Sequence, residues 1–223
     1  MSDIYKIATL NINGMATSPR IAILEDFLQK LVIDIVLLQE VTRPVFDDIR
    51  GFTAYTNIGT AGRGTAILTR DHIQLTIIVC LPAGRGMAAD FQNVTIVNIY
   101  APSGAERMRD RENFFSNELP YLLRGIPPLL LAGGDFNSVL TNLDAIRHPN
   151  YSRALQEFIR GFDLVNMWET SQERNNYTHY TSRRADYLAV VVRIALEATT
   201  MRRGRSYWKM NTALPCEKLF QEQ

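Results

Sequence analysis

Four apolar segments of this sequence end in polar side chains whose types suit phosphate chemistry. The segments end at Asn11, at Glu40, at Tyr100 and at Asp135, with Asn137 two residues further on. Strand ends at one edge of a sheet converge in space, so these groups can share one site. Carboxylate and amide oxygens suit Mg²⁺, which keeps several waters and leaves room for a substrate phosphate. A carboxylate near an asparagine can also activate water as a general base.

Each of these residues also has a structural interpretation when it is taken alone. Asn11 and Asn13 are common turn residues, and Asp135 could cap a turn. A glutamate after a strand, such as Glu40, is usually solvated, and Tyr100 could be a packed strand end. The joint occurrence of oxygen-bearing groups at four strand ends favours a common metal-phosphate site.

The segments around these residues predict how the site is positioned. Apolar runs predict strands at residues 4–10, 33–38, 62–68, 73–80, 91–100, 129–132, 177–181 and 188–196. Helices are expected after Ser18, at 106–123 with a kink or early stop at Pro120, and at 152–160. Strands outnumber helices, and several consecutive strands have no helix between them. We therefore expect an α/β fold, a two-sheet β-sandwich flanked by helices.

Composition and charge limit the possible functions and partners of the protein only in part. The 223 residues are 46% hydrophobic, enough for a sizeable core, and the net charge of +1 neither supports nor excludes a nucleic-acid partner. Two cysteines without a CxxC spacing favour an intracellular protein. The sequence shows no leader peptide and no apolar run of membrane-spanning length, so no membrane is expected. We expect one domain at residues 1–198 and a basic connector or tail at 199–223.

Four short motifs resemble the successive signature blocks of the endonuclease/exonuclease/phosphatase superfamily, in the same order. They are LNING (10–14), LLQE (37–40), VNIYAP (97–102) and GGDFNS (133–138). Further stretches are similar to the nuclease domain that precedes the reverse transcriptase in LINE-type (non-LTR) retrotransposons, which resembles apurinic/apyrimidinic endonucleases. These stretches are GRGTAIL (62–68), IYAPSG (99–104), YTHYTS (177–182) and GRSYWKMN (204–211).

The resemblance implies a DNase I-like fold and a Mg²⁺-dependent (or Mn²⁺-dependent) DNA endonuclease that nicks target DNA by hydrolysing a phosphodiester bond. It also implies that DNA is a partner, that a reverse transcriptase domain belongs to a longer parent polyprotein, and that the protein acts in the nucleus.

The resemblance further implies a role for each residue of the site. Glu40 would bind the metal and Asn11 would support it. Tyr100 would contact the scissile phosphate. Asp135 would position or deprotonate the attacking water, and Asn137 would hold the phosphate. Thr178 would contact the nucleic-acid backbone.

The C-terminal part of the resemblance is incomplete. The family pattern ends with an aspartate on a strand and then an Asp-His pair, but this sequence has room for one of these blocks, at RADYL (184–188). Asp186 therefore stands either for the strand aspartate or for the aspartate of the pair, with Tyr187 in the histidine's place. The second alignment fits better, because an apolar run and the basic connector follow directly. Part of the C-terminal sheet is then missing.

A tyrosine can donate a hydrogen bond but carries no positive charge near neutral pH. We therefore expect impaired activity. The alternatives are a catalytically dead retrotransposon-derived fragment, a nucleic-acid-binding remnant, or a phosphatase or phospholipid phosphodiesterase of the same superfamily.

Overall fold

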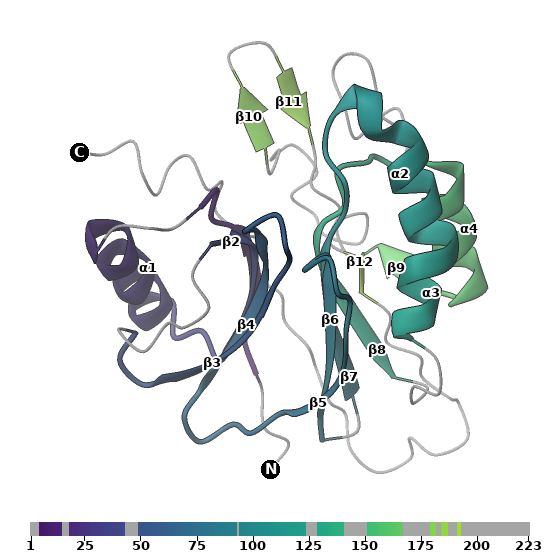
Figure 1. Cartoon of the computed structure of the whole chain (residues 1–223). Helices are drawn as coiled ribbons and strands as arrows, with labels where there is room; N and C mark the ends of the chain where they lie inside the picture. The colour runs from purple at the N-terminus through teal and green to yellow at the C-terminus, as the bar shows by residue number, and fades with distance from the viewer. Residues whose placement is uncertain are drawn as a thin grey trace.

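Two mixed β-sheets pack face to face, and helices cover their outer faces (Figure 1). The structure is a computed structural model, and it describes residues 5–14, 18–42, 49–92, 94–123, 129–140, 151–166, 179–181, 184–186 and 191–192. The first sheet has the order β1-β2-β4-β3. Its strands are β1 (Ile7–Asn11), β2 (Ile35–Val41), β3 (Phe52–Ile58) and β4 (Gly64–Arg70). The predicted two-sheet α/β fold is confirmed.

The second sheet has the order β5-β6-β7-β8-β12-β9. Its strands are β5 (Thr76–Cys80), β6 (Gly86–Phe91), β7 (Val94–Tyr100), β8 (Leu130–Asp135), β9 (Val165–Asn166) and β12 (Val191–Val192). A separate hairpin pairs β10 (His179–Thr181) with β11 (Arg184–Asp186). Parallel pairing aligns the strand ends: Asn11 lies opposite Gln39 in the first sheet, and Tyr100 lies opposite Asp135 in the second.

Apolar side chains form three layers, one between the sheets and one under each set of helices. In β2, Ile35 and Leu37 face the second sheet, while Val36 and Leu38 pack toward α1 (Ser18–Lys30). Because both faces of β2 are buried, its sequence is a nearly continuous apolar run rather than an alternating one. This burial is why the strand could be recognised from sequence.

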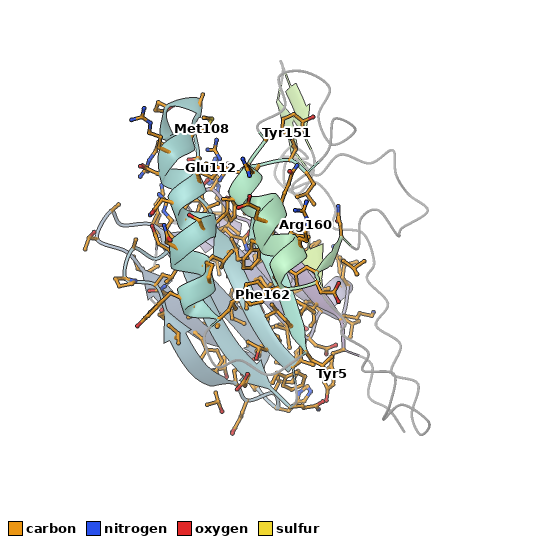
Figure 2. All side chains as sticks on the ribbon, turned by 90° about the vertical axis from the view of Figure 1, so that its right-hand side faces the viewer. Tyr5, Met108, Glu112, Tyr151, Arg160 and Phe162 are labelled. Carbon is orange, nitrogen blue, oxygen red and sulfur yellow. The ribbon has the colours of Figure 1, made fainter. Side chains whose placement is uncertain are left out.

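A continuous helical run and α4 cover the outer face of the second sheet (Figure 1, Figure 2). The run consists of η1 (Ala105–Arg107), α2 (Met108–Asn113), the π-helical turn η2 (Phe114–Glu118) and α3 (Leu119–Leu122). The N-cap of α4 (Arg153–Gly161) is Ser152, whose hydroxyl accepts from Leu155 N at 3.0 Å. Glu112 Oε2 accepts from Ala154 N at 2.9 Å, so α2 contributes a second cap to α4.

Two buried amides connect the sheets. Gln39 Nε2 donates to Asn98 Oδ1 at 2.7 Å, and Asn98 Nδ2 donates to Leu38 O and Ala66 O at 2.9 and 2.8 Å. Both side chains are buried, so these bonds satisfy groups that water cannot reach. Gln39 of the LLQE motif and Asn98 of the VNIYAP motif therefore hold the two sheets together.

Some expected boundaries were wrong. The segment 91–100 is not one strand, because β6 ends at Phe91 and β7 begins at Val94. Pro120 does not stop its helix early. The π-helical turn before it lets Leu119 N donate to Phe114 O, five residues back, and the helix continues to Leu122. Among the helices of the described segments, none has the length and apolar character needed to span a membrane.

The C-terminal predictions mostly concern segments outside the described residues. These predictions are the missing part of the sheet, the domain end at 198 and the basic tail at 199–223. Each of them stays a prediction.

Candidate active site

Asn11, at the end of β1, joins the two carboxylates of the candidate site. Its Nδ2 donates to Glu40 Oε1 at 3.0 Å and to Asp135 Oδ2 at 2.7 Å. Its Oδ1 accepts from Asn13 N at 2.9 Å, which fixes the orientation of the amide. Side chains at or next to the ends of β1, β2 and β8 therefore meet, although Asn11 and Asp135 are 124 residues apart in the sequence.

Glu40 lies at a β-bulge in β2. Gln39 pairs with Thr65 and Val41 with Gly64, so Glu40 has no direct partner on β4. Its φ is 58°, a left-handed conformation that is uncommon for residues other than glycine. Bulges re-aim side chains near active sites, and unusual backbone conformations of this kind cluster at functional positions. Only 15% of the Glu40 side chain is exposed, so its carboxylate lies at the rim of the site.

Asp135 and Asn137 form a short turn after β8. Asp135 is buried, and its Oδ1 accepts from Asn137 N at 3.0 Å. Asn137 Nδ2 donates to Ala101 O at 2.9 Å, which connects this turn to the residue after Tyr100. The GGDFN segment therefore holds a carboxylate and an amide in fixed positions beside the end of β7.

Tyr100 is buried at the end of β7, between groups of opposite charge. The Arg85 guanidinium lies over its ring, 4.4 Å from the ring centroid, and the ion pair of Arg63 with Glu40 lies close to its phenol. Burial raises the pKa of the phenol above its ordinary value and the Glu40 carboxylate raises it further, whereas Arg85 and Arg63 lower it. The net direction is upward, so the phenol stays protonated near neutral pH and can donate a hydrogen bond.

The loop after Tyr100 is held by a buried arginine. Arg111 Nη1 donates to Pro102 O and to Gly104 O, both at 3.0 Å. Burial lowers the pKa of Arg111 from its ordinary high value, while Glu112 and Glu106 raise it. An arginine remains charged under such conditions, so α2 holds this loop through charge-assisted hydrogen bonds.

The oxygens at Glu40 fit a hard divalent cation better than a softer metal. In the part of the chain that the structure describes, no three His, Cys, Asp or Glu side chains are grouped to hold one ion. Mg²⁺ is commonly bound through one or two carboxylates together with substrate phosphates and water. Glu40, with Asn11 beside it, matches that pattern. Arg63 forms an ion pair with Glu40 Oε2, so a positive group already lies against this carboxylate.

The structure thus brings together five of the residues predicted from sequence: Asn11, Glu40, Tyr100, Asp135 and Asn137. Thr178 lies outside the described residues. The backbone of Asp186 ends β11, opposite His179, and its side chain is not described. The roles assigned to all seven predicted site residues stay predictions.

Two arginines of the site, Arg63 and Arg85, were not predicted from the sequence motifs. Arg63 and Arg85 each stand in a glycine-flanked turn, where a charged residue is ordinarily solvated. The available signal was that both occur in the same four-residue sequence, Ala-Gly-Arg-Gly, at 61–64 and 83–86.

Solved structures share this architecture. An AP endonuclease from Archaeoglobus fulgidus matches with a TM-score of 0.70 and 18% identity, over 85% of this chain and 86% of that one. The endonuclease domain of TRAS1, a telomere-specific non-LTR retrotransposon, matches with a TM-score of 0.62 and 18% identity, over 84% of each chain. A 3′ phosphatase, NExo, from Neisseria, solved with a product DNA hairpin, matches with a TM-score of 0.64 and 16% identity, over 84% of this chain and 86% of that one.

No curated protein has a significantly similar sequence. At these identities, the solved structures establish the fold alone. The sequence itself matches the family model for the endonuclease/exonuclease/phosphatase family over residues 8–207, which includes every strand end of the site. With its two-sheet fold and its strand-end cluster of Asn11, Glu40 and Asp135, the chain belongs to the endonuclease/exonuclease/phosphatase family.

Proposed function

We propose that this chain is a Mg²⁺-dependent DNA endonuclease domain of a non-LTR retrotransposon, which hydrolyses a phosphodiester bond to nick target DNA. The observation that carries the proposal is the shared contact of Asn11 Nδ2 with Glu40 and Asp135. One amide holds a candidate metal ligand and a candidate general base at the same strand edge. The family's nucleases generally depend on divalent metals, and Mn²⁺ has the same ligand preferences.

Each residue has a distinct task in the proposed hydrolysis. Glu40 holds the cation, with Asn11 orienting its carboxylate. Bound there, the cation would polarise a phosphoryl oxygen and stabilise the leaving oxygen. Asp135 orients the attacking water and accepts its proton.

Tyr100 and Asn137 act on the substrate. Tyr100 donates a hydrogen bond to the scissile phosphate, and its protonated phenol is suited to this. Asn137 holds a second phosphate oxygen. Thr178 contacts the nucleic-acid backbone, and Asp186 supplies the remaining carboxylate of the family pattern.

The assignment to a non-LTR retrotransposon rests on the sequence motifs described above and on the similarity of the fold to the TRAS1 endonuclease domain. We infer a reverse transcriptase domain as partner within a longer polyprotein, and action in the nucleus, where the target DNA lies. The absence of the family's terminal histidine from the sequence supports reduced activity. The alternative is a catalytically dead remnant that only binds nucleic acid.

Plasmid nicking tests the proposal. The chain should convert supercoiled plasmid to the open-circular form with Mg²⁺ and not with EDTA. Glu40→Ala should lower the rate by a factor on the order of 10²–10³, as removal of a key electrostatic group does. Glu157→Ala removes an exposed glutamate of α4 and should leave the rate unchanged. No nicking by the unaltered chain, or equal nicking by Glu40→Ala, would contradict the proposal.

A further inference from the structure

Two turns that share a four-residue sequence pack against each other beside the candidate site, and together they are called the double turn. The turn between β3 and β4 and the turn between β5 and β6 both contain Ala-Gly-Arg-Gly. The turns belong to different sheets, and their backbones are in contact. A Cβ added to Gly59 would lie 2.2 Å from Ala83 O, and one added to Gly84 would lie 2.5 Å from Gly59 N. Only glycine fits at these two positions, because a side chain at either one would clash with the backbone of the other turn.

Hydrogen bonds hold this double turn in place. Asn57 Nδ2, from β3, donates to Leu81 O and Gly86 O, both at 2.9 Å. Within the first turn, Gly59 N donates to Arg63 O at 3.0 Å. In the second, Tyr100 N donates to Arg85 O at 2.9 Å. The Arg85 backbone is therefore fixed directly to Tyr100, and the Arg63 backbone is fixed within its own turn.

The side chains of the arginine pair (Arg63 and Arg85) reach two neighbouring residues of the site, Glu40 and Tyr100, from the two turns. Arg63 pairs with Glu40, yet 51% of its side chain is exposed. Arg85 lies over the Tyr100 ring, is half-buried, and donates to Ala101 O at a long 3.4 Å. A guanidinium has five N–H donors, so these contacts leave donors of both arginines open toward solvent.

This arrangement suits an anion with several oxygens. Arginine binds phosphate through paired N–H groups, and its planar group keeps stacking and hydrogen-bonding contacts at the same time. Phosphate neutralisation by such side chains supplies most of the sequence-independent affinity for DNA.

We propose that the arginine pair binds phosphates of the duplex DNA backbone next to the hydrolytic site. The inference rests on the proposed function for the identity of the substrate. Arg63 and Arg85 would form a positive surface on the side of the site where the double turn lies. The family motifs did not indicate this surface.

Binding of a short fluorescein-labelled duplex, measured by anisotropy in EDTA so that no cleavage occurs, tests this assignment. The double variant Arg63→Gln/Arg85→Gln should bind on the order of tenfold to a hundredfold more weakly. Its plot of log affinity against log salt concentration should be shallower by about 2, since each phosphate contact contributes about 0.9. Arg63→Lys/Arg85→Lys keeps both charges and should retain the steeper slope.

A matched control loses the same charge elsewhere. Arg109 and Arg160 are exposed on α2 and α4, in the helical layer over the outer face of the second sheet; Arg160 is labelled in Figure 2. Arg109→Gln/Arg160→Gln should bind duplex as the unaltered chain does. Thermal unfolding of each variant separates lost binding from lost folding.

The outcomes distinguish this inference from the proposed function. If the chain nicks plasmid but Arg63→Gln/Arg85→Gln binds duplex with unchanged affinity and salt slope, the arginine assignment is wrong and the endonuclease proposal stands. If duplex binding depends on the arginine pair but no nicking occurs, the assignment stands and the endonuclease proposal fails.

Discussion

Tyr100 connects the electrostatics of the site to the stability of the protein. Burial and the nearby Glu40 carboxylate favour its neutral phenol, and this preference outweighs the opposing effect of Arg63 and Arg85. A phenol whose pKa is raised in the folded state loses its proton later than it does in the unfolded chain. The resulting stabilisation is fully present below the ordinary tyrosine pKa, about 10, and is lost as the pH rises through the raised value.

Tyr100→Phe should therefore change the pH dependence of stability. As the pH rises above about 10, the free energy of unfolding of the unaltered chain should fall more steeply than that of Tyr100→Phe. Urea unfolding followed by circular dichroism at several pH values measures this difference. Parallel curves for the two proteins over that range would show that Tyr100 is not protected from ionisation.

Among the elements, β2 and β7 contribute both to the site and to the junction between sheets. Glu40 and Tyr100 belong to the site, whereas their neighbours Gln39 and Asn98 connect the two sheets. Because the sheets are locked together within one or two residues of the site, the relative positions of Glu40 and Tyr100 depend on this buried junction.

Asn98→Ala should destabilise the protein. It removes the donor to Leu38 O and Ala66 O and the acceptor for Gln39, all in a buried layer. We expect a loss of about 1–3 kcal/mol in the free energy of unfolding, the cost of leaving buried polar groups unsatisfied. Urea denaturation measures the loss. Asn113→Ala, at an exposed asparagine of α2, is the control and should stay within about 0.5 kcal/mol of the unaltered chain. Equal stability of the two variants would contradict a structural role for Asn98.

Sequence patterns predicted elements whose burial leaves a clear periodicity. The dense apolar run of β2 and the capped, amphipathic α4 were recognised because burial on both faces, or on one helical stripe, fixes the residue types. Strand β3 was missed because most of its residues are only half-buried and include Thr and Asn. Strand β6 was missed because GMAADF is rich in Gly and Ala, which have low strand propensity; its neighbours on both sides hold it in the sheet.

The candidate site was predictable where a residue ends a strand. Asn11, Glu40 and Asp135 were identified in this way, and their mutual contacts agree with the expected convergence. Arg63 and Arg85 were not predictable, because their contacts depend on two turns from different sheets meeting in space. The bulge that turns Glu40 also arises from pairing with β4, which local sequence does not specify.

For the whole molecule, the two halves of the chain differ in how closely they follow the family pattern. The proposed metal-binding and water-activating residues lie in the first 138 residues, where all four N-terminal signature blocks are present. The C-terminal part has no histidine after His179, so we expect the family's terminal Asp-His pair to be incomplete. Metal binding and full catalytic rate are therefore expected to be separable in this protein.

A chain restored with the family's missing segment, inserted between Thr181 and Leu188 and including the Asp-His pair, should nick DNA faster. A phosphate-binding histidine typically changes the rate by a factor on the order of 10²–10³. Plasmid nicking under identical Mg²⁺ concentrations measures the gain, and calorimetric titration of Mg²⁺ should give equal affinities for both chains. If the present chain cleaves as fast as the restored one, Tyr187 or His179 fills the role assigned to the absent histidine.

The central claim is that Glu40 binds the cation while Asp135 activates water, and a metal titration of plasmid nicking tests it most directly. Glu40→Gln weakens a ligand, so its nicking rate should rise toward that of the unaltered chain as Mn²⁺ is increased. Asp135→Asn removes the proton acceptor, so its rate should stay low at every Mn²⁺ concentration. Rescue of Asp135→Asn by Mn²⁺ without rescue of Glu40→Gln, or full activity of both variants without added metal, would contradict the account.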